Sequence, residues 1–162
     1  LAVARRDAEQ VKMVKDYGTR ELYGLSQCLT ILSALWFDPL WKESGICQLA
    51  GFIVFVLGVS LRVWAIRTLG EYYSHVVRTI DQHRIVETGP YSLLRHPAYA
   101  GMITAHLGIV ILYFNCVSLP IFLLLLVPSI VIRILIEEKT LFGIEGYADF
   151  ARDGKRIIPC VW

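Results

Sequence analysis

Two short stretches of this sequence hold residues whose types and spacing could perform chemistry. The first is Arg95-His96-Pro97-Ala98-Tyr99, which stands directly before an apolar run. Pro97 suits the first turn of a helix, where its missing N–H costs nothing, so His96 is expected at or near the N-cap. A helix N-terminus presents unpaired N–H groups and a positive dipole end, which favour a carboxylate or another anion. On these residues alone, a structural role for His96 and Tyr99 as cap and interfacial anchor is an equal alternative.

The second stretch is Arg133, Glu137 and Glu138 near the end of an apolar run. Arg133 and Glu137 are four residues apart, so they share one face of a helix. A charge at the centre of a membrane helix costs about 2.5–3.5 kcal/mol on insertion scales, so such residues tend to face a polar cavity. A self-contained ion pair would leave Glu138 without a partner, and we therefore favour a functional site.

The elements that must position these residues are apolar helices. Of the 162 residues, 56% are hydrophobic, and the mean hydropathy is +0.55. Soluble domains hold about 45–50% apolar residues, and the excess here is gathered in runs, which indicates a bilayer environment. We predict an all-α, multi-pass membrane helix bundle in one domain, residues 1–162, with about four spans. The predicted spans are 22–37, 46–66, 98–114 and 118–138.

Polar segments connect and follow these spans. Residues 67–99 carry charges and a Thr-Gly-Pro turn, and we expect them to form a functional loop. Asn115 and Pro120 favour a tight turn, so that the last two spans form a C-terminal helical hairpin. The hairpin would bring the two chemistry-bearing stretches together around one pocket. Residues 139–162 form a polar tail.

The distribution of charge predicts the orientation of the chain. Of the 16 Lys and Arg residues, only Lys42 lies in a connection on the far side of four spans. The positive-inside rule therefore places both termini and the loop in the cytoplasm. A net charge of +2 is too small to indicate a nucleic-acid binder. The four cysteines lack metal-type spacing, so we expect no metal site.

An ordered series of motifs resembles the isoprenylcysteine carboxyl methyltransferase family over roughly residues 67–162. Members of this family are multi-pass membrane enzymes that transfer a methyl group from S-adenosylmethionine to the carboxylate of a lipid-modified cysteine. The series comprises Gly70-Glu-Tyr-Tyr-Ser-His-Val-Val, His83-Arg84-Ile85-Val86, Gly89-Pro90-Tyr91, Arg95-His96-Pro97-Ala98-Tyr99-Ala100-Gly101, Arg133-x-x-x-Glu137-Glu138, Tyr147 and Ile158-Pro159.

The resemblance also implies roles for individual residues. It implies that Arg133 is the catalytic residue that contacts substrate. The sequence departs from the family pattern at Phe150 and Cys160, and we expect the first span of fuller members to be missing before residue 22. The implied S-adenosylmethionine pocket is lined by Arg78, His83, Arg84, Ile85, Val86, Tyr91, His96, Pro97, Ala98, Tyr99 and Glu137.

Methyl transfer to a carboxylate requires few catalytic side chains. Methyl transfer from a sulfonium is an in-line displacement, in which the protein mainly supplies alignment. A carboxylate acceptor is ionised at neutral pH and needs a cation, for which Arg133 offers a forked donor. Glu137 would pair with the cofactor, and a lipophilic acceptor would enter from the bilayer. The bacterial inner membrane and the endoplasmic reticulum both fit, and the oligomeric state is open.

Other functions fit parts of the sequence. Phospholipid N-methyltransferases and small-thiol S-methyltransferases act on acceptors that must lose a proton, so Glu138 or a histidine would serve as a base. Membrane sterol reductases show a similar Arg-His-Pro-like stretch. Outside enzymes, a haem-binding carrier or a structural membrane protein is the alternative, although His106 is the only histidine inside a predicted span.

Overall fold

Helices form nearly all of the part of the chain that the computed structural model describes, which is residues 12–13, 18–41, 45–70, 78–79, 85–144 and 146–158. Two short strands, β1 (Lys12–Met13) and β2 (Arg78–Thr79), pair in antiparallel fashion. The helical elements are α1 (Thr19–Trp36), α2 (Gly45–Leu69), η2 (Gly89–Ser92), α3 (Pro97–Leu112), α4 (Ser118–Ile121), η3 (Phe122–Leu126), α5 (Val127–Leu141) and α6 (Tyr147–Asp153).

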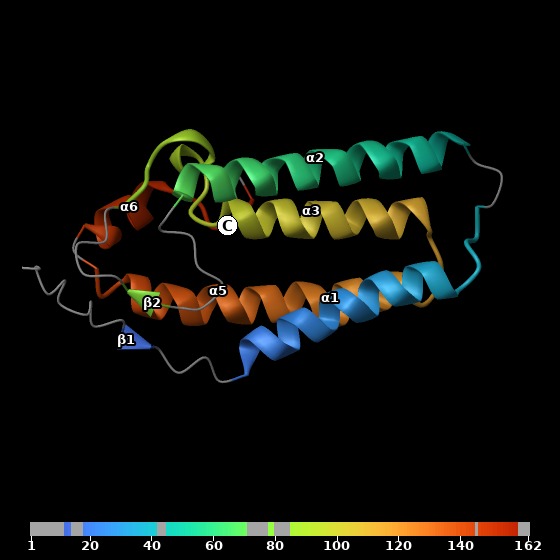
Figure 1. Ribbon diagram of the computed structural model, residues 1–162, viewed down its shortest axis with the longest axis horizontal. Coiled ribbons are helices and arrows are strands. Elements are labelled where there is room, and N and C mark those ends of the chain that lie inside the picture. Colours follow the sequence, from blue (N-terminus) through green and yellow to red (C-terminus); the bar gives the residue numbers. More distant parts are fainter. Residues whose placement is uncertain are drawn as a thin grey trace, which may run out of the picture.

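The long helices lie in two layers. Figure 1 shows α2 and α3 side by side in one layer, with α1 and α5 in the other and α6 at the end where α3 begins. The buried apolar core includes Val110 of α3 together with Leu126, Ile130 and Ile134 of the last long helix. The core therefore joins the two layers along the length of the bundle.

Small residues hold α2 and α3 together. Gly51 and Gly58 of α2 face Gly108 and Gly101 of α3, and a Cβ atom added at any of the four would fall 3.0 Å or less from backbone atoms of the other helix. This spacing of seven residues on each helix keeps the glycines on one face. Glycines at such positions let two helix backbones approach closely, as in many membrane helix pairs.

Among the described residues, two helical stretches are long and apolar enough to cross a membrane, namely α2 and the continuous run Ser118–Leu141, while α3 is a shorter apolar helix. Only 17% and 33% of their most apolar windows are buried inside the structure. A core helix of a soluble domain would be mostly buried, so these exposed apolar faces fit a lipid environment.

Helix boundaries differ from the sequence-based spans by a few residues. Helix α2 continues through Leu69 and α3 begins at Pro97, so both ends of the predicted loop 67–99 are helical. The last predicted span, 118–138, is helical through Leu141, but residues 122–126 have π-helical hydrogen bonding. Pro128 lies in the first turn of α5 and has no N–H to donate, so a local change in the bonding pattern just before it is expected.

The turn between α3 and α4 is organised by Asn115. Its Oδ1 accepts the backbone N–H groups of Val117 and Ser118 at 3.0 and 2.8 Å. Its Nδ2 donates to the carbonyls of Ser33 at the end of α1 and of Tyr113 at the end of α3. One buried amide therefore caps α4 and ties together both layers at the end opposite α6.

Replacing Asn115 with alanine is expected to destabilise the folded protein by about 1–2 kcal/mol, because a helix cap is lost and buried carbonyls lose a donor. The thermal unfolding midpoint in detergent measures this effect. The neighbouring exposed Cys116 supplies the control, since Cys116→Ala should leave the midpoint unchanged. Equal midpoints for the two variants would contradict the capping role.

Candidate functional site

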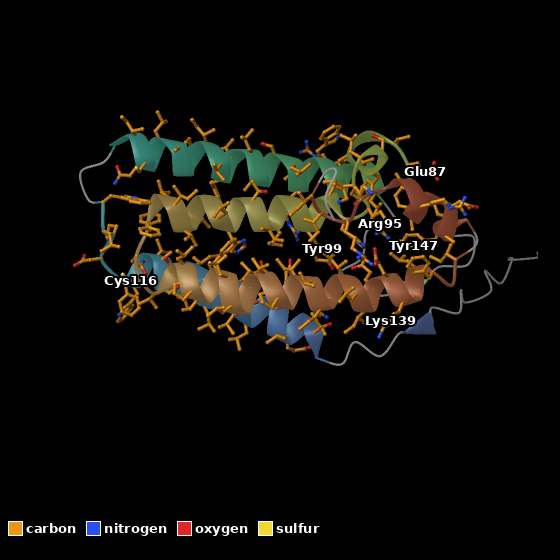
Figure 2. The ribbon with its side chains drawn as sticks, turned by 180° about the vertical axis from the view of Figure 1, so that it is seen from behind. Glu87, Arg95, Tyr99, Cys116, Lys139 and Tyr147 are labelled. Carbon is orange, nitrogen blue, oxygen red and sulfur yellow. The ribbon has the colours of Figure 1, made fainter. Side chains whose placement is uncertain are left out.

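Polar side chains from three helices gather at the end of the bundle where α3 begins and α5 ends. Figure 2 shows Arg95, Tyr99 and Tyr147 close to this end, far from Cys116 at the other. Arg95 lies just before α3, and Tyr99 lies in its first turn. The first turn of α1 adds Thr19. Two hydrogen-bonded networks connect all of these groups except Tyr147.

The first network is centred on Tyr99. Its hydroxyl donates to Oε2 of Glu137 at 2.8 Å and accepts from Nε of Arg133 at 3.0 Å. The guanidinium of Arg133 also donates to Oγ1 of Thr19 at 3.3 Å. Arg133 is 3% exposed, and the Tyr99 ring packs edge-on against Tyr23. Tyr99 thus bridges the guanidinium and carboxylate that lie one turn apart on α5.

The second network is centred on Glu138, which is 3% exposed. Its Oε1 lies 2.7 Å from a terminal nitrogen of Arg95 and 3.3 Å from Nε2 of His96. Its Oε2 accepts from Nε of Arg156 at 2.8 Å. A buried charge needs such partners, because burial without them costs several kcal/mol. Glu138 therefore connects α5 to the segment before α3 and to the end of the described chain.

The start of α3 is held from several sides. His96 is the N-cap residue, with Pro97 at the first helical position, as the sequence predicts. The His96 carbonyl accepts the N–H groups of Tyr99 and Ala100, each at 3.1 Å. From α2, Arg62 donates to the Ala98 carbonyl at 3.1 Å. These hydrogen bonds hold the first turn of α3 in place and thereby position the Tyr99 side chain.

Two buried donors of this region have no hydrogen-bond partner among the described residues. They are Nε of Arg95 and the hydroxyl of Tyr147 on α6. Burial, together with the nearby Glu138 carboxylate, raises the pKa of the Tyr147 hydroxyl above its usual range. Tyr147 therefore stays protonated and able to donate. Unsatisfied buried donors are costly, and they are compatible with a site that completes its hydrogen bonds with a ligand.

The structure brings several of the residues implied by the resemblance to this end of the bundle. The start of α3 is formed by His96, Pro97, Ala98 and Tyr99. Arg133 and Glu137 of α5 contact it through the Tyr99 hydroxyl. Tyr91 is buried in η2, a few residues earlier. Ile85 and Val86 are half-buried, and a Cβ at Gly146 would touch Ile85. Predictions for His83, Arg84 and the side chain of Arg78 lie outside the described residues.

Several contributors were not predicted from the sequence. Arg95 belongs to the first chemistry-bearing stretch, but its pairing with Glu138 was not predicted, and neither was the contribution of Arg156 from the end of the described chain. Thr19 is one of several hydroxyl residues, and Arg62 is a single charge near the end of a span. Neither belongs to a recognisable motif. The one available signal was the need of Glu138 for a partner of its own, which did not say which cation would supply it.

Comparison with known proteins decides the family. The family model described as the isoprenylcysteine carboxyl methyltransferase (ICMT) family matches residues 50–143, which include both networks' residues on α3 and α5. The chain belongs to the isoprenylcysteine carboxyl methyltransferase family. The resemblance predicted from the motifs is therefore confirmed.

Individual relatives support this assignment. The chain is 38% identical over 132 residues to the protein-S-isoprenylcysteine O-methyltransferase of Saccharomyces cerevisiae, covering 78% of this chain and 55% of the relative. It is 31% identical over 159 residues to a probable protein-S-isoprenylcysteine O-methyltransferase of Oryza sativa subsp. indica, covering 95% of this chain and 81% of the relative. The chain thus spans about half of the yeast family member and most of the rice one.

A solved structure shares the fold. It is the eukaryotic intramembrane Ras methyltransferase ICMT, determined without a monobody, with a TM-score of 0.69 and 26% sequence identity. The match covers 91% of this chain and 55% of that chain. The prediction of a helical membrane fold is confirmed at this level, since the described helices and their exposed apolar faces agree with an intramembrane family member.

Proposed function

We propose that this chain carries out S-adenosylmethionine-dependent methyl transfer to the carboxylate of a lipophilic, isoprenylcysteine-type acceptor. The observation that carries the proposal is the Arg133–Tyr99–Glu137 chain at the start of α3. In this chain the Tyr99 hydroxyl lies between Arg133, a cation that suits an acceptor carboxylate, and Glu137, an anion that suits a cofactor. Membership of the family supplies the reaction class.

The residues present fit S-adenosylmethionine, which carries a carboxylate, an ammonium group and ribose hydroxyls. Glu137 is half-buried and offers a carboxylate to a positive or hydroxyl group. The unsatisfied donors of Arg95 and Tyr147 suit a carboxylate or another acceptor. When bound, S-adenosylmethionine supplies an electrophilic methyl group on a positively charged sulfur. We infer that Tyr91, His96 and the α3 first turn complete its pocket, with Arg78, His83, Arg84, Ile85 and Val86 contributed by the preceding loop.

Arg133 is the proposed catalytic residue. Its guanidinium, which is also bonded to Tyr99 and Thr19, would pair with the acceptor carboxylate by charge-assisted hydrogen bonds and so fix the attacking oxygen in space. The acceptor oxygen held by Arg133 would take the methyl group that bound S-adenosylmethionine supplies. A carboxylate needs no deprotonation. This suits the site, because the oxygens of Glu138 are occupied by Arg95 and Arg156 and are not free to act as a base.

We infer four membrane spans, formed by α1, α2, α3 and the run α4–η3–α5, with the last two as a helical hairpin. The short spans require some bilayer thinning or snorkelling of flanking residues, at a modest cost per ångström. The distribution of Lys and Arg favours a cytoplasmic position for the site and both ends of the chain. In this arrangement the exposed apolar side chains of α1 and α2 face lipid, and an acceptor's lipid chain reaches the site from the bilayer.

Calorimetric titration with S-adenosylhomocysteine tests the cofactor site. The wild-type protein is expected to bind it, and Glu137→Ala is expected to weaken binding at least tenfold, because a charge-assisted hydrogen bond is worth about 1.5–3 kcal/mol. Glu21→Ala removes an exposed carboxylate from the first turn of α1 and should leave the affinity unchanged. Equal affinities for wild type and Glu137→Ala would count against the assignment of Glu137.

Transfer of labelled methyl groups to a panel of acceptors tests the substrate class. A prenyl-cysteine with a free carboxylate is expected to be methylated, and its methyl ester is expected to be inert. Preference for a phospholipid amine or a small thiol would replace the proposed acceptor, and binding of S-adenosylhomocysteine without any transfer would limit the proposal to the cofactor.

A further inference from the structure

The end of the described chain lies across the start of α3. Residues 154–158, which we name the C-terminal strap, run beside the segment that precedes the helix. The backbone N–H of Arg95 donates to the Lys155 carbonyl at 2.6 Å, and that of His96 donates to the Arg156 carbonyl at 2.9 Å. The strap thus supplies backbone acceptors to the two residues that lead into the helix.

These bonds take the place of one half of a capping box. His96 occupies the N-cap of α3, and no side chain of the described residues caps that helix end. In a capping box, a side chain returns to the N-cap N–H. Here the Arg156 carbonyl takes that place, so the entry angle of the chain depends on where the strap lies.

A single carboxylate joins the side chains of the strap to those of the segment before α3. Arg156 of the strap donates to one oxygen of Glu138, while Arg95 and His96 approach the other oxygen. Ile157 of the strap is buried in the apolar core. These backbone and side-chain bonds together join α5, the segment before α3 and the strap. They lie beside the Tyr99 network and share no side chain with it.

We infer that Glu138 and Arg156 are positioning residues of the cofactor site: they hold the C-terminal strap against residues 94–96 and thereby fix the first turn of α3. This inference rests on the proposed function. Tyr99 is bonded through its N–H to the His96 carbonyl, so a shift of His96 moves the hydroxyl that joins Arg133 to Glu137. Misplacement of a ligand-holding group by about 1 Å can lower a rate by about 100-fold.

The test compares two arginines of the same terminal segment. Arg156 is paired with buried Glu138, whereas Arg152 on α6 is paired with Asp149 at the surface, where both side chains are more than three-quarters exposed. Arg156→Gln is expected to weaken S-adenosylhomocysteine binding about tenfold, as loss of an outer hydrogen-bond partner commonly does. Arg156→Lys should recover part of the affinity, and Arg152→Gln should leave it at the wild-type value.

Hydrogen exchange provides a readout that does not depend on ligand binding. The amides of Arg95 and His96 are expected to lose protection in Arg156→Gln and to keep it in Arg152→Gln. If the wild-type protein binds no S-adenosylhomocysteine, the proposed function fails, while the exchange measurement still decides whether the strap fixes these amides. Unchanged affinity and unchanged protection in Arg156→Gln would overturn the inference, as would equal losses in Arg152→Gln.

A milder variant covers the case in which Arg156→Gln does not fold. A Cβ added at Gly154 would lie 3.0 Å from Cγ of Arg95, so Gly154→Ala should push the Arg95 side chain aside by a few tenths of an ångström and strain its contact with Glu138 without removing any charge. Weaker binding together with lower protection at His96 is the expected result. A folded Gly154→Ala protein with wild-type affinity and protection would contradict the positioning role.

Discussion

Replacing Arg133 with lysine is expected to lower methyl transfer about 100-fold while leaving the protein folded. Lysine keeps the charge but replaces a planar fork by a single ammonium group. It also cannot retain the bonds that Arg133 makes to Tyr99 and Thr19. Loss of alignment at the attacking oxygen accounts for an effect of this size. Steady-state kinetics with a prenyl-cysteine acceptor measures it.

The control for this substitution is Arg67→Lys, because Arg67 is an exposed residue near the end of α2. It should retain wild-type turnover. Binding of S-adenosylhomocysteine to Arg133→Lys should fall much less than turnover, since Glu137 and the first turn of α3 are retained. Wild-type turnover in Arg133→Lys would rule out its catalytic role, and a joint collapse of binding and turnover would assign it to the cofactor instead.

The substitution Gly58→Ala is expected to destabilise the protein by about 3 kcal/mol, at the upper end of the usual cost of overpacking. A Cβ at Gly58 would overlap the backbone of Ala105 and lie 2.8 Å from the Gly101 carbonyl. No side chain can rotate away to make room, so α2 and α3 must separate. Because these helices form the most extensive contact between elements in the described structure, their separation should lower the stability of the whole bundle. Thermal unfolding in detergent measures the change.

Gly24→Ala is the matched control for Gly58→Ala. Gly24 lies inside α1, and a Cβ added there would meet no atom within 4 Å. Alanine favours a helix over glycine by about 1 kcal/mol, so Gly24→Ala should be neutral or slightly stabilising. Unfolding midpoints that do not differ between Gly58→Ala and Gly24→Ala would show that the α2–α3 contact is less close than the structure indicates.

Tyr99, Arg133 and Glu137 could be identified from the sequence, but their arrangement could not. Spacing placed Arg133 and Glu137 on one helix face, and the Pro97 position predicted a helix start at His96. The sequence did not predict that the Tyr99 hydroxyl would lie between the guanidinium and the carboxylate. That arrangement depends on the rotation of α3 against α5, which side-chain packing across the two layers determines.

The partners of Glu138 illustrate the same limit more strongly. An isolated glutamate on an apolar helix requires a counter-charge, and this requirement follows from the sequence through the cost of desolvation. Which of the 16 Lys and Arg residues pair with Glu138 does not follow from the sequence, because this depends on which segments of the folded chain lie beside Glu138. Arg95 and Arg156 meet there because the C-terminal strap lies beside the segment before α3.

The sequence by itself determined that the chain is helical, that its helices carry apolar faces for a bilayer, and that it belongs with isoprenylcysteine carboxyl methyltransferases. These properties follow from local composition and from motifs within single segments, where hydrophobicity and capping act over a few residues. Only the tertiary structure decided that α2 packs on α3 through glycines and that Glu138 joins three segments. Those features arise from contacts between residues far apart in the chain, and a contact of that kind is set by how complete helices fit against one another.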